Sequence, residues 1–470
     1  MTSIYFSNYQ VEEDTDYFLY IGELKNYGLN HFLKDALSKF YHRKFKFIAI
    51  VPDIAEQYNY DNVIVINPLV NDYKCRYGSH VNCRVSAAEF MATVSKTREI
   101  QCLIEQILRR QDHLFLYMYE SLEEMTLDEI PGVSILGPDK TIAREVNNKV
   151  VQLTQLKEIV PLVEHEILRG GKALLETTAG LWNQWDQGIF VTRPFSAAGI
   201  NSVVAQSNGE IQTKFDLGGE DAEPETEFII SRYMPHDLDP TVLAVVAGED
   251  DIYIAGIADQ RISHGNRFTG STFPSAANAE QRQLLREHTR AVGKWLAQQG
   301  YRGIFGCDYI ITHDGEIYFL EINARKQGTT LEFCCTLEQG LPHQAPNLPE
   351  LEFFAVTQEI FPANTCELDH GSIPLHWGTY NYKIEDPVKT STYIPQASGE
   401  REAFARVSKR NLKKDFLILE HTGSDFVIAQ GAFIGRIVAL GQDLESVTQG
   451  ISQGCKTIEL TFSQSQNESS

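Results

Sequence analysis

Two carboxylates, a carboxamide and an arginine recur at regular spacing in the second half of the chain. Asp308 lies near the start of one apolar stretch, and Glu321, Asn323 and Arg325 follow at two-residue intervals in another. Alternate residues of a β-strand share one face, so the last three are expected to point the same way, with Asp308 on the neighbouring strand. Carboxylate and amide oxygens suit Mg²⁺ held against phosphates. The pattern therefore predicts a magnesium site of Asp308, Glu321 and Asn323, beside an Arg325 guanidinium that meets an anion.

A β-hairpin and the helix before it must position these residues. Strands are expected over Phe305–Thr312 and Glu316–Ile322, and the Asp314-Gly315 step between them is a strong hairpin signal. A helix is expected from about Ala279 to Gln299, because apolar residues recur along one side of it and Gly300 is a natural stop.

The residues before this helix indicate one further helix and a set of strands. Apolar residues recur at helical spacing from about Thr141, and Pro161 lies just beyond the end of that pattern. The strands expected after it are Ile189–Arg193, Val203–Gln206, Glu227–Tyr233, Val242–Ala247 and Ile252–Ile257.

The first part of the chain alternates short apolar strands with helices, which favours an open parallel α/β sheet. A helix is expected over Leu29–Phe40. The strands expected here are Tyr17–Ile21, Phe45–Val51, Val63–Ile66, His113–Tyr119 and Val133–Leu136. Residues 341–351 are expected to form a loop, and the last hundred or so residues to be mostly β structure with a short helix over Asp443–Gln449 and a final strand.

Composition excludes several classes of function. The chain has 470 residues, so two to four domains are expected, and its net charge of −22 disfavours broad binding to nucleic acid or to anionic membranes. The N-terminus lacks the basic region of a signal peptide, and no apolar run is long enough to span a membrane. Eight cysteines in a chain of this length are interpreted as reduced, which predicts a cytoplasmic protein.

The stretch Gly303–Thr330 resembles the metal-binding hairpin of the ATP-grasp superfamily, whose members include biotin carboxylase and D-alanine–D-alanine ligase. Those enzymes carry an acid on the first strand and Glu-x-Asn on the second, and biotin carboxylase-like members add an Arg two residues later, as this chain does. The resemblance implies that Asp308, Glu321 and Asn323 bind Mg²⁺ ions bridging ATP phosphates. It also implies that Arg325 holds an acyl phosphate or a substrate carboxylate.

The resemblance extends toward the N-terminus in the family's order. Lys149 stands where a family lysine contacts ATP phosphates, and Arg193, before Pro194, stands where another lysine is usual, ahead of a loop that ends at Gly199. The strand ending in Ser231, Arg232, Tyr233 and Met234 resembles the hinge that offers main-chain groups to adenine. Asp239 matches a position that often bonds ribose hydroxyls, and Asp237 is a competing choice.

The remaining candidates lie after the hinge and near the end. Arg261, His264 and Arg267, followed by a small polar run, are interpreted as a substrate-facing surface with Arg267 as a catalytic candidate, and a solvated loop is an equal alternative. Residues 435–445 resemble the C-terminal lid region of biotin carboxylase-like members. The fold expected is thus α/β and α+β: an N-terminal pre-ATP-grasp domain over 1–140, an ATP-grasp domain over 141–355 with its hinge near 231–234, and a β-rich lid domain over 356–470.

The resemblance implies an ATP- and Mg²⁺-dependent ligase that activates a carboxylate as an acyl phosphate and couples it to an amine, releasing ADP and phosphate. Amino acids or short peptides are the preferred substrates, no nucleic acid or membrane partner is expected, and a homodimer is possible. Two alternatives stay open. One is a non-catalytic nucleotide-binding regulator on the same fold, which the Arg193 substitution favours, and the other is a carboxylase-type subunit.

Overall fold

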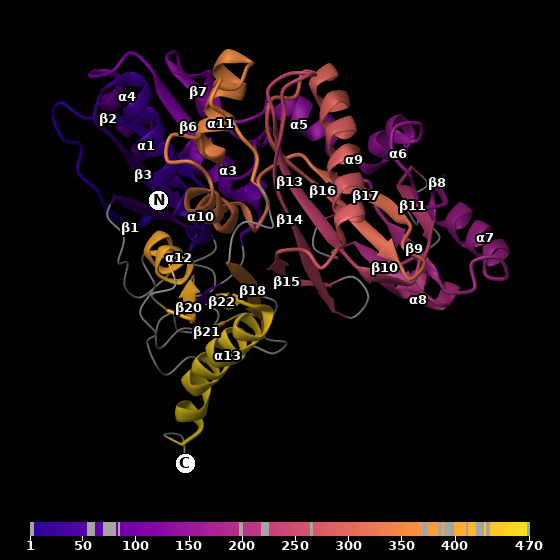
Figure 1. Cartoon of the computed structure of the whole chain (residues 1–470). Coiled ribbons are helices and arrows are strands. Elements are labelled where there is room, and N and C mark those ends of the chain that lie inside the picture. Colours follow the sequence, from indigo (N-terminus) through magenta and orange to yellow (C-terminus); the bar gives the residue numbers. More distant parts are fainter. Residues whose placement is uncertain are drawn as a thin grey trace.

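The computed structural model describes residues 4–53, 62–68, 81–82, 85–196, 201–217, 225–263, 267–368, 375–383, 388–389, 399–409, 412–419, 427–428 and 433–467. Two large sheets and one small sheet, each with helices packed on it, make up most of this part of the chain (Figure 1).

The first large sheet has six strands in the order β1-β4-β3-β2-β6-β7. All neighbours run parallel except β1 and β4, so the predicted open parallel sheet is confirmed. Its strands are β1 (Ile4–Asn8), β2 (Asp16–Ile21), β3 (Phe45–Val51), β4 (Val63–Ile66), β6 (Leu114–Met118) and β7 (Val133–Leu136).

Helices cover both faces of this sheet because its strands are apolar on both sides. Phe18 and Tyr20 pack in one core cluster with α1 (Leu29–Tyr41), whereas Leu19 and Ile21 pack in another with α3 (Ala87–Lys96) and α4 (Arg98–Leu108). Two short 3₁₀ turns, η1 (Leu24–Asn26) and η2 (Leu127–Glu129), lie after β2 and before β7.

The helix expected from Thr141 is in fact two helices, α5 (Lys140–Val146) and α6 (Lys149–Leu156). Asn148 has an extended backbone between them, and its side chain accepts a hydrogen bond of 2.9 Å from the Val150 N–H. Asparagine competes with helical backbone bonds and is favoured at the N-cap, so it starts a new helix here. The apolar spacing alone could not show this break.

A small antiparallel sheet follows, in the order β10-β9-β11-β8. Its strands are β8 (His165–Arg169), β9 (Ile189–Thr192), β10 (Ser202–Ala205) and β11 (Glu227–Arg232). One face packs on α7 (Gly171–Leu181) and α8 (Asn208–Phe215) around Phe228. We call this unit the small lobe.

The second large sheet has nine strands, in the order β12-β16-β13-β14-β15-β18-β22-β20 with β17 on β16. The helix α9 (Ala279–Gln298) packs on it almost as expected, and the predicted hairpin is β16 and β17. The strands are β12 (His236–Leu238), β13 (Pro240–Val246), β14 (Ile252–Ser263), β15 (Arg267–Phe273), β16 (Gly303–Thr312), β17 (Ile317–Asn323), β18 (His376–Lys383), β20 (Lys414–Leu419) and β22 (Phe433–Gly441). A separate three-stranded sheet joins β19 (Val388–Lys389), β21 (Val427–Ile428) and β5 (Val81–Asn82).

The C-terminal helices differ from the sequence prediction. The expected loop over 341–351 gives way to α11 (Leu348–Gln358), which Asn347 caps, and the expected final strand is part of one long helix, α13 (Leu444–Asn467). Gly450 and Gly454 let α13 approach the sheet, since a Cβ at these positions would lie 2.9 Å from Ala439 Cβ and 2.7 Å from Ile437 Cγ2. Here the glycines serve close packing rather than helix termination. The other helices are α10 (Thr330–Gly340) and α12 (Glu400–Ser408).

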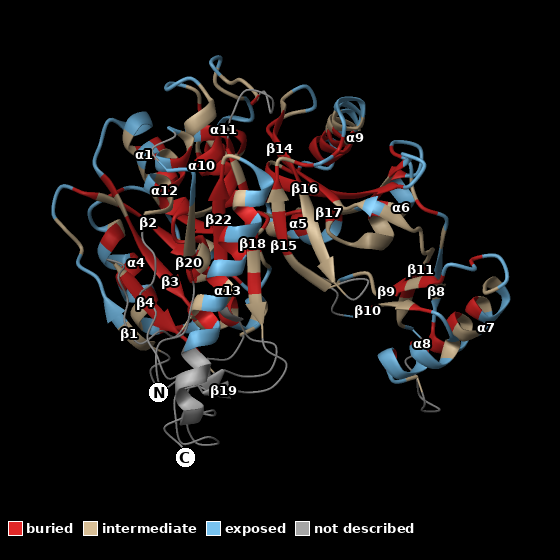
Figure 2. Ribbon diagram, turned by 60° about the horizontal axis from the view of Figure 1, so that its bottom comes forward, coloured by how far each residue is buried: buried red, intermediate tan, exposed pale blue. Residues whose placement is uncertain are grey.

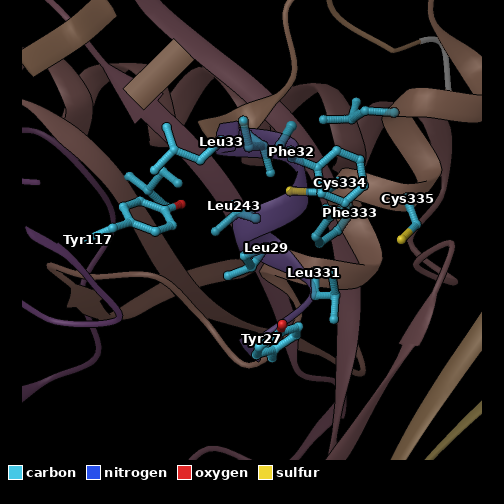
Figure 3. Close-up of a cluster of buried hydrophobic side chains, with 14 of the residues drawn as sticks. Tyr27, Leu29, Phe32, Leu33, Tyr117, Leu243, Leu331, Phe333, Cys334 and Cys335 are labelled. Atoms are coloured by element: carbon cyan, nitrogen blue, oxygen red, sulfur yellow. The ribbon is translucent and has the colours of Figure 1, made fainter. Parts of the chain in front are cut away.

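One hydrophobic core joins all three predicted regions. Figure 3 shows Phe32 of α1, Leu243 of β13 and Phe333 of α10 in this cluster, which also contains Ile437 of β22. The buried Trp377 of β18 stacks on Phe273 of β15 with ring centroids 5.3 Å apart. In Figure 2 the buried residues form a continuous band through both large sheets, with exposed residues mainly on helices and loops. No helix in the described ranges combines the length and the apolar character that a bilayer span requires.

Candidate nucleotide and metal site

A cavity of about 810 Å³ lies between the small lobe and the nine-stranded sheet, and residues that follow β2, β3 and β6 of the first sheet also line it. Strand pairing explains which small-lobe side chains face it. Thr192 pairs with Ile229 and Phe190 with Ser231, and all four line the cavity, whereas Val191 and Phe228 point into the small-lobe core. The predicted residues that line it are Lys149, Ser231, Arg232, Tyr233, Met234, Asp239, Asp308, Glu321, Asn323 and Arg325.

The two predicted acidic ligands are direct cross-strand neighbours, Asp308 on β16 and Glu321 on β17. Asp308 is 9 % exposed, and hydrogen bonds hold its two oxygens separately. Thr241 Oγ1 donates to Asp308 Oδ1 at 2.6 Å and Asn323 Nδ2 donates to Oδ2 at 2.9 Å. Gln327 Nε2 is 3.3 Å from Oδ1 and also donates to Thr241 Oγ1 at 2.8 Å. The carboxylate therefore has a fixed orientation.

Burial and, after it, the nearby Glu321 carboxylate together raise the pKa of Asp308 to about 6, although the hydrogen bonds from Thr241, Gln260 and Asn323 act to lower it. Two like charges on adjacent strands are unfavourable unless a cation lies between or beside them. The donor set is also all oxygen, which is the chemistry of a hard divalent cation. These residues fit a magnesium site.

Lys149 begins α6 and reaches across to the hairpin. Its ammonium forms an ion pair with Glu321 and donates to the Ser196 carbonyl at 3.2 Å, and its main-chain N–H donates to the Pro194 carbonyl at 3.1 Å. The first turn of α6 is thus tied both to β17 and to the chain after β9. Gly199, in the predicted loop over the phosphates, lies outside the described residues.

Arg325 lies just after β17, next to the Asn323 side chain. Its Nη2 donates to Asn323 Oδ1 at 2.9 Å, and its Nη1 lies 3.2 Å from the Tyr119 hydroxyl. Burial disfavours its charge, but Tyr119, Glu120 and Glu321 outweigh that effect and raise the pKa of Arg325. The guanidinium is therefore a fixed cation that joins the hairpin to the end of the first sheet.

His236 and Asp239 form a second charged pair on the cavity wall. His236 Nδ1 is 2.7 Å from the Met234 carbonyl and Nε2 is 2.9 Å from Asp239 Oδ1. A carbonyl and a carboxylate are both acceptors, so this arrangement favours the doubly protonated, positively charged imidazole, in keeping with the raised pKa of His236. Of the two acids weighed for the ribose, Asp239 lines the cavity, whereas Asp237 is exposed and pairs with His313.

The structure places Arg193 away from the expected phosphate contact. Its guanidinium lies 5.7 Å from the Phe228 ring centroid and 5.9 Å from that of Phe215, in the small-lobe core. Strand alternation explains this position, because the cavity face of β9 carries Phe190 and Thr192. The prediction that Arg193 replaces a phosphate-binding lysine is therefore not supported by its position.

The remaining residues that the sequence suggested for the substrate do not all lie at the cavity. Arg267 starts β15, where it pairs with Ser263, and the cavity-lining residues of that strand are Phe268 and Ser271. His264 lies outside the described residues. Arg436 of β22, in the segment that resembles a lid, lines the cavity and donates to Glu332 and to the Gly328 carbonyl.

Sequence reasoning missed Thr241 and Gln327. Gln327 continues the two-residue spacing after Arg325, which is a signal that could have identified it. Thr241 offers no such signal, since it is one hydroxyl in a buried strand. Leu320, 40 % exposed and on the cavity wall, is another residue that periodicity did not indicate.

A family model described as "ATP-grasp domain" matches residues 182–329, which include the hinge strand, Asp308, Glu321, Asn323 and Arg325. The chain carries an ATP-grasp domain. The hairpin and the small lobe described above are thus parts of an ATP-grasp fold, as the resemblance implied.

Among curated proteins, the chain is 23 % identical over 216 residues to a [butirosin acyl-carrier protein]–L-glutamate ligase of Niallia circulans. The match covers 44 % of this chain and 50 % of that protein, so the chain spans about half the length of that relative.

Solved structures extend the likeness in fold over nearly the whole chain. The biotin carboxylase domain of the Hydrogenobacter thermophilus 2-oxoglutarate carboxylase, in complex with MgADP, ADP and bicarbonate, has a TM-score of 0.61 at 12 % identity and covers 93 % of this chain and 89 % of its own. The N5-carboxyaminoimidazole synthase of Aspergillus clavatus, in complex with ADP and 5-aminoimidazole ribonucleotide, has a TM-score of 0.55 at 13 % identity, covering 95 % and 99 %. At these identities the likeness establishes the fold.

Proposed function

We propose that this protein is an ATP-dependent carboxylate–amine ligase acting on amino acids or short peptides. The observation that carries the proposal is the convergence of Lys149, Asp308, Glu321, Asn323 and Arg325 on one cavity inside an ATP-grasp fold. These residues come from a helix, two strands and the following loop, and together they supply cations for phosphates and a substrate carboxylate, with oxygen ligands for a metal.

The cavity wall offers a distinct role to each group. The hinge residues Ser231–Met234 and the exposed Leu320 side chain give adenine an apolar surface and main-chain partners, and Asp239 lies within reach of the ribose end. Lys149 contacts the phosphates. Asp308, Glu321 and Asn323 would hold Mg²⁺, which when bound offsets charge on the transferred phosphoryl group.

The reaction proposed has two steps that need no protein nucleophile. A carboxylate oxygen forms a bond to the γ-phosphorus as the bond to the β,γ-bridging oxygen breaks, which gives an acyl phosphate and ADP. The amine nitrogen then bonds to the acyl carbon, the carbon–oxygen bond to phosphate breaks, and the nitrogen loses a proton. Lys149 and Arg325 stabilise the charge that develops, and fixed positions supply much of the remaining rate.

Arg325 is the proposed anchor for the carboxylate substrate. Its planar fork suits a carboxylate, and its contacts to Asn323 and Tyr119 fix its place next to the metal ligands. The relative from Niallia circulans is named as a ligase of L-glutamate, which supports an amino acid as the acid.

The test is a screen for phosphate release with Mg-ATP over paired amino acids, peptides and small carboxylic acids, with L-glutamate first and mass spectrometry of the products. The Arg325→Ala variant separates a ligase from a nucleotide-binding regulator. We expect it to bind a non-hydrolysable ATP analogue while product formation falls steeply, with poor rescue by Arg325→Lys because a point charge lacks the bidentate geometry. Binding of the analogue without turnover on any pair would contradict the ligase assignment.

A further inference from the structure

The α6 helix carries a buried polar residue that the site described above does not use. Gln152 is 1 % exposed, lies one turn after Lys149 and is surrounded by apolar positions of the same helix. It does not belong to the set of cavity-lining residues, whereas Lys149 and Leu153 do. A buried carboxamide is costly unless its hydrogen bonds are made, so its partners indicate its role.

Those partners lie in the metal-binding hairpin. Gln152 Oε1 accepts from the Ile322 N–H at 2.8 Å, and Nε2 donates to the Ile322 carbonyl at 3.1 Å and to the Val146 carbonyl at 3.0 Å. The pair of bonds to one residue reproduces what a neighbouring strand would make with β17. Both N–H groups and the oxygen of the carboxamide are thus used.

The hydrogen bonds from Gln152 to Ile322, which we call the clamp, matter because of where Ile322 lies. Ile322 stands between Glu321 and Asn323, on the edge of β17 opposite β16. Along that edge the Phe319 N–H donates to the Pro161 carbonyl at 2.8 Å. Gln152 therefore fixes the backbone from which two proposed metal ligands project.

The first turn of α6 carries Lys149 and also fixes the backbone beside its partner, Glu321. Lys149 meets the Glu321 side chain, and Gln152, three residues later on the same face, holds the main chain next to it. The Ala324 N–H also lies 3.4 Å from Asn147 Oδ1, just before α6. The two main-chain bonds from Gln152 to Ile322 thus add fixed geometry to the apolar packing and the single ion pair that otherwise join α6 and β17.

We propose that Gln152 is a positioning residue that sets the phosphate-contacting Lys149 and the metal ligands Glu321 and Asn323 in register with one another. This role rests on the proposed function of the cavity as a nucleotide and metal site, although it does not depend on which acid or amine is joined.

Gln111, which lies just before β6 and bonds to Tyr17 of β2, offers a matched control. Gln111 Oε1 accepts from the Tyr17 N–H at 2.7 Å, and its Nε2 donates to the Tyr17 carbonyl at 2.9 Å and to the His113 carbonyl at 2.7 Å. It is a buried glutamine that clamps one strand residue with the same pattern, and it does not line the cavity. Gln111→Met and Gln152→Met therefore remove equivalent bonds in different places, and the exposed Gln155→Met in α6 serves as the control for the helix.

The experiment measures melting temperature, affinity for a non-hydrolysable ATP analogue and the Mg²⁺ concentration for half-maximal analogue binding. We expect Gln152→Met and Gln111→Met to lower the melting temperature by similar amounts. Only Gln152→Met should weaken metal-dependent nucleotide binding, by about 10- to 100-fold, the usual effect of removing a residue that orients metal ligands. Gln152→Glu keeps the volume and the acceptor for the Ile322 N–H, and as the neutral acid, the form that burial favours, it can donate to one of the two carbonyls, so it serves as the second variant if the methionine variant does not fold.

A double-mutant cycle with Lys149→Met tests the mechanism. If Gln152 acts through register with Lys149, the loss of affinity in Gln152→Met should be much smaller in the Lys149→Met background. Equal stability losses with unchanged nucleotide and metal binding would overturn the positioning role while leaving the ligase proposal intact. A wild-type protein that binds no nucleotide would instead overturn the proposed function and the positioning role with it.

Discussion

Lys149 and Glu321 lie 172 residues apart in the chain and form an ion pair on the wall of the cavity. In the proposed reaction, the Lys149 ammonium binds the negatively charged phosphates, and the Glu321 carboxylate binds the positively charged metal. Both side chains are partly shielded from solvent, with exposed fractions of 14 % and 26 %. When the nucleotide and its metal bind together, the Lys149–Glu321 pair is replaced by two pairs, Lys149 with phosphate and Glu321 with the metal. Each of the two ligands is therefore expected to favour binding of the other.

Glu321→Gln should abolish turnover and leave the fold intact, because an amide keeps the volume and loses the negative charge. A fall of about 10²–10³ in rate is expected, the usual cost of removing one charged contact to the transition state. Phosphate release and thermal melting measure the two parts. Glu316→Gln, on the exposed turn of the same hairpin, is the control. Wild-type activity of the Glu321→Gln variant at saturating Mg-ATP would show that the hairpin takes no part in the reaction.

Thr241→Val should weaken Mg²⁺ binding about 10- to 100-fold, since the hydroxyl orients the Asp308 carboxylate at 2.6 Å and receives Gln327. The shape of the side chain is preserved, so the effect isolates the hydrogen bonds. Mg²⁺ dependence of analogue binding is the measurement, and Thr178→Val, a buried threonine in α7, is the control. An unchanged Mg²⁺ dependence would show that the orientation of Asp308 does not matter for the metal.

Arg193→Ala should lower the free energy of unfolding by about 1 kcal/mol, because the guanidinium stacks on Phe215 and Phe228. Its affinity for the ATP analogue should stay nearly unchanged, whereas Lys149→Met should lose affinity. Denaturant unfolding and calorimetric titration test both parts. A collapse of ATP affinity in Arg193→Ala would mean that Arg193 turns toward the cavity when nucleotide binds.

The imidazole of His236 should titrate above its ordinary pKa of 6.5. Burial is the largest single influence and opposes the charge, but the hydrogen bonds to Asp239 and to the Met234 carbonyl, together with the Asp239 and Asp237 charges, outweigh burial and raise the pKa. A raised pKa in the folded state adds stability that is fully present below the unfolded pKa and is lost as the pH rises through the folded pKa. Asp239→Asn should lower this pKa in an NMR titration and remove that part of the pH dependence. The exposed Asp237→Asn should have a smaller effect, and an unshifted His236 in the wild type would contradict the charged pair.

The hairpin could be predicted from the sequence because its information is local: an Asp-Gly turn and two-residue spacing of ligands decide both the strands and their faces. Other parts depend on partners far along the chain. Asn148 starts α6 by capping it with its side chain, and the role of Gln152 can be recognised only when its hydrogen bonds to Ile322 are known. For Arg193, the likeness to a family lysine pointed to the cavity, whereas the alternation of β9 places it in the core. Periodicity in the sequence predicts individual helices and strands, but contacts between distant segments are known only from the tertiary structure.

Because β15 pairs with β18, the C-terminal strands extend the nine-stranded sheet. Trp377 packs against both Phe273 and Phe333 where these strands meet. Cutting the chain near residue 355 would therefore not release a self-sufficient ATP-grasp fragment. It would strip the partner from β15 and leave an apolar sheet edge open to other chains, which is the usual route to aggregation. Dissection of this protein should follow the sheet rather than the linear order of the segments.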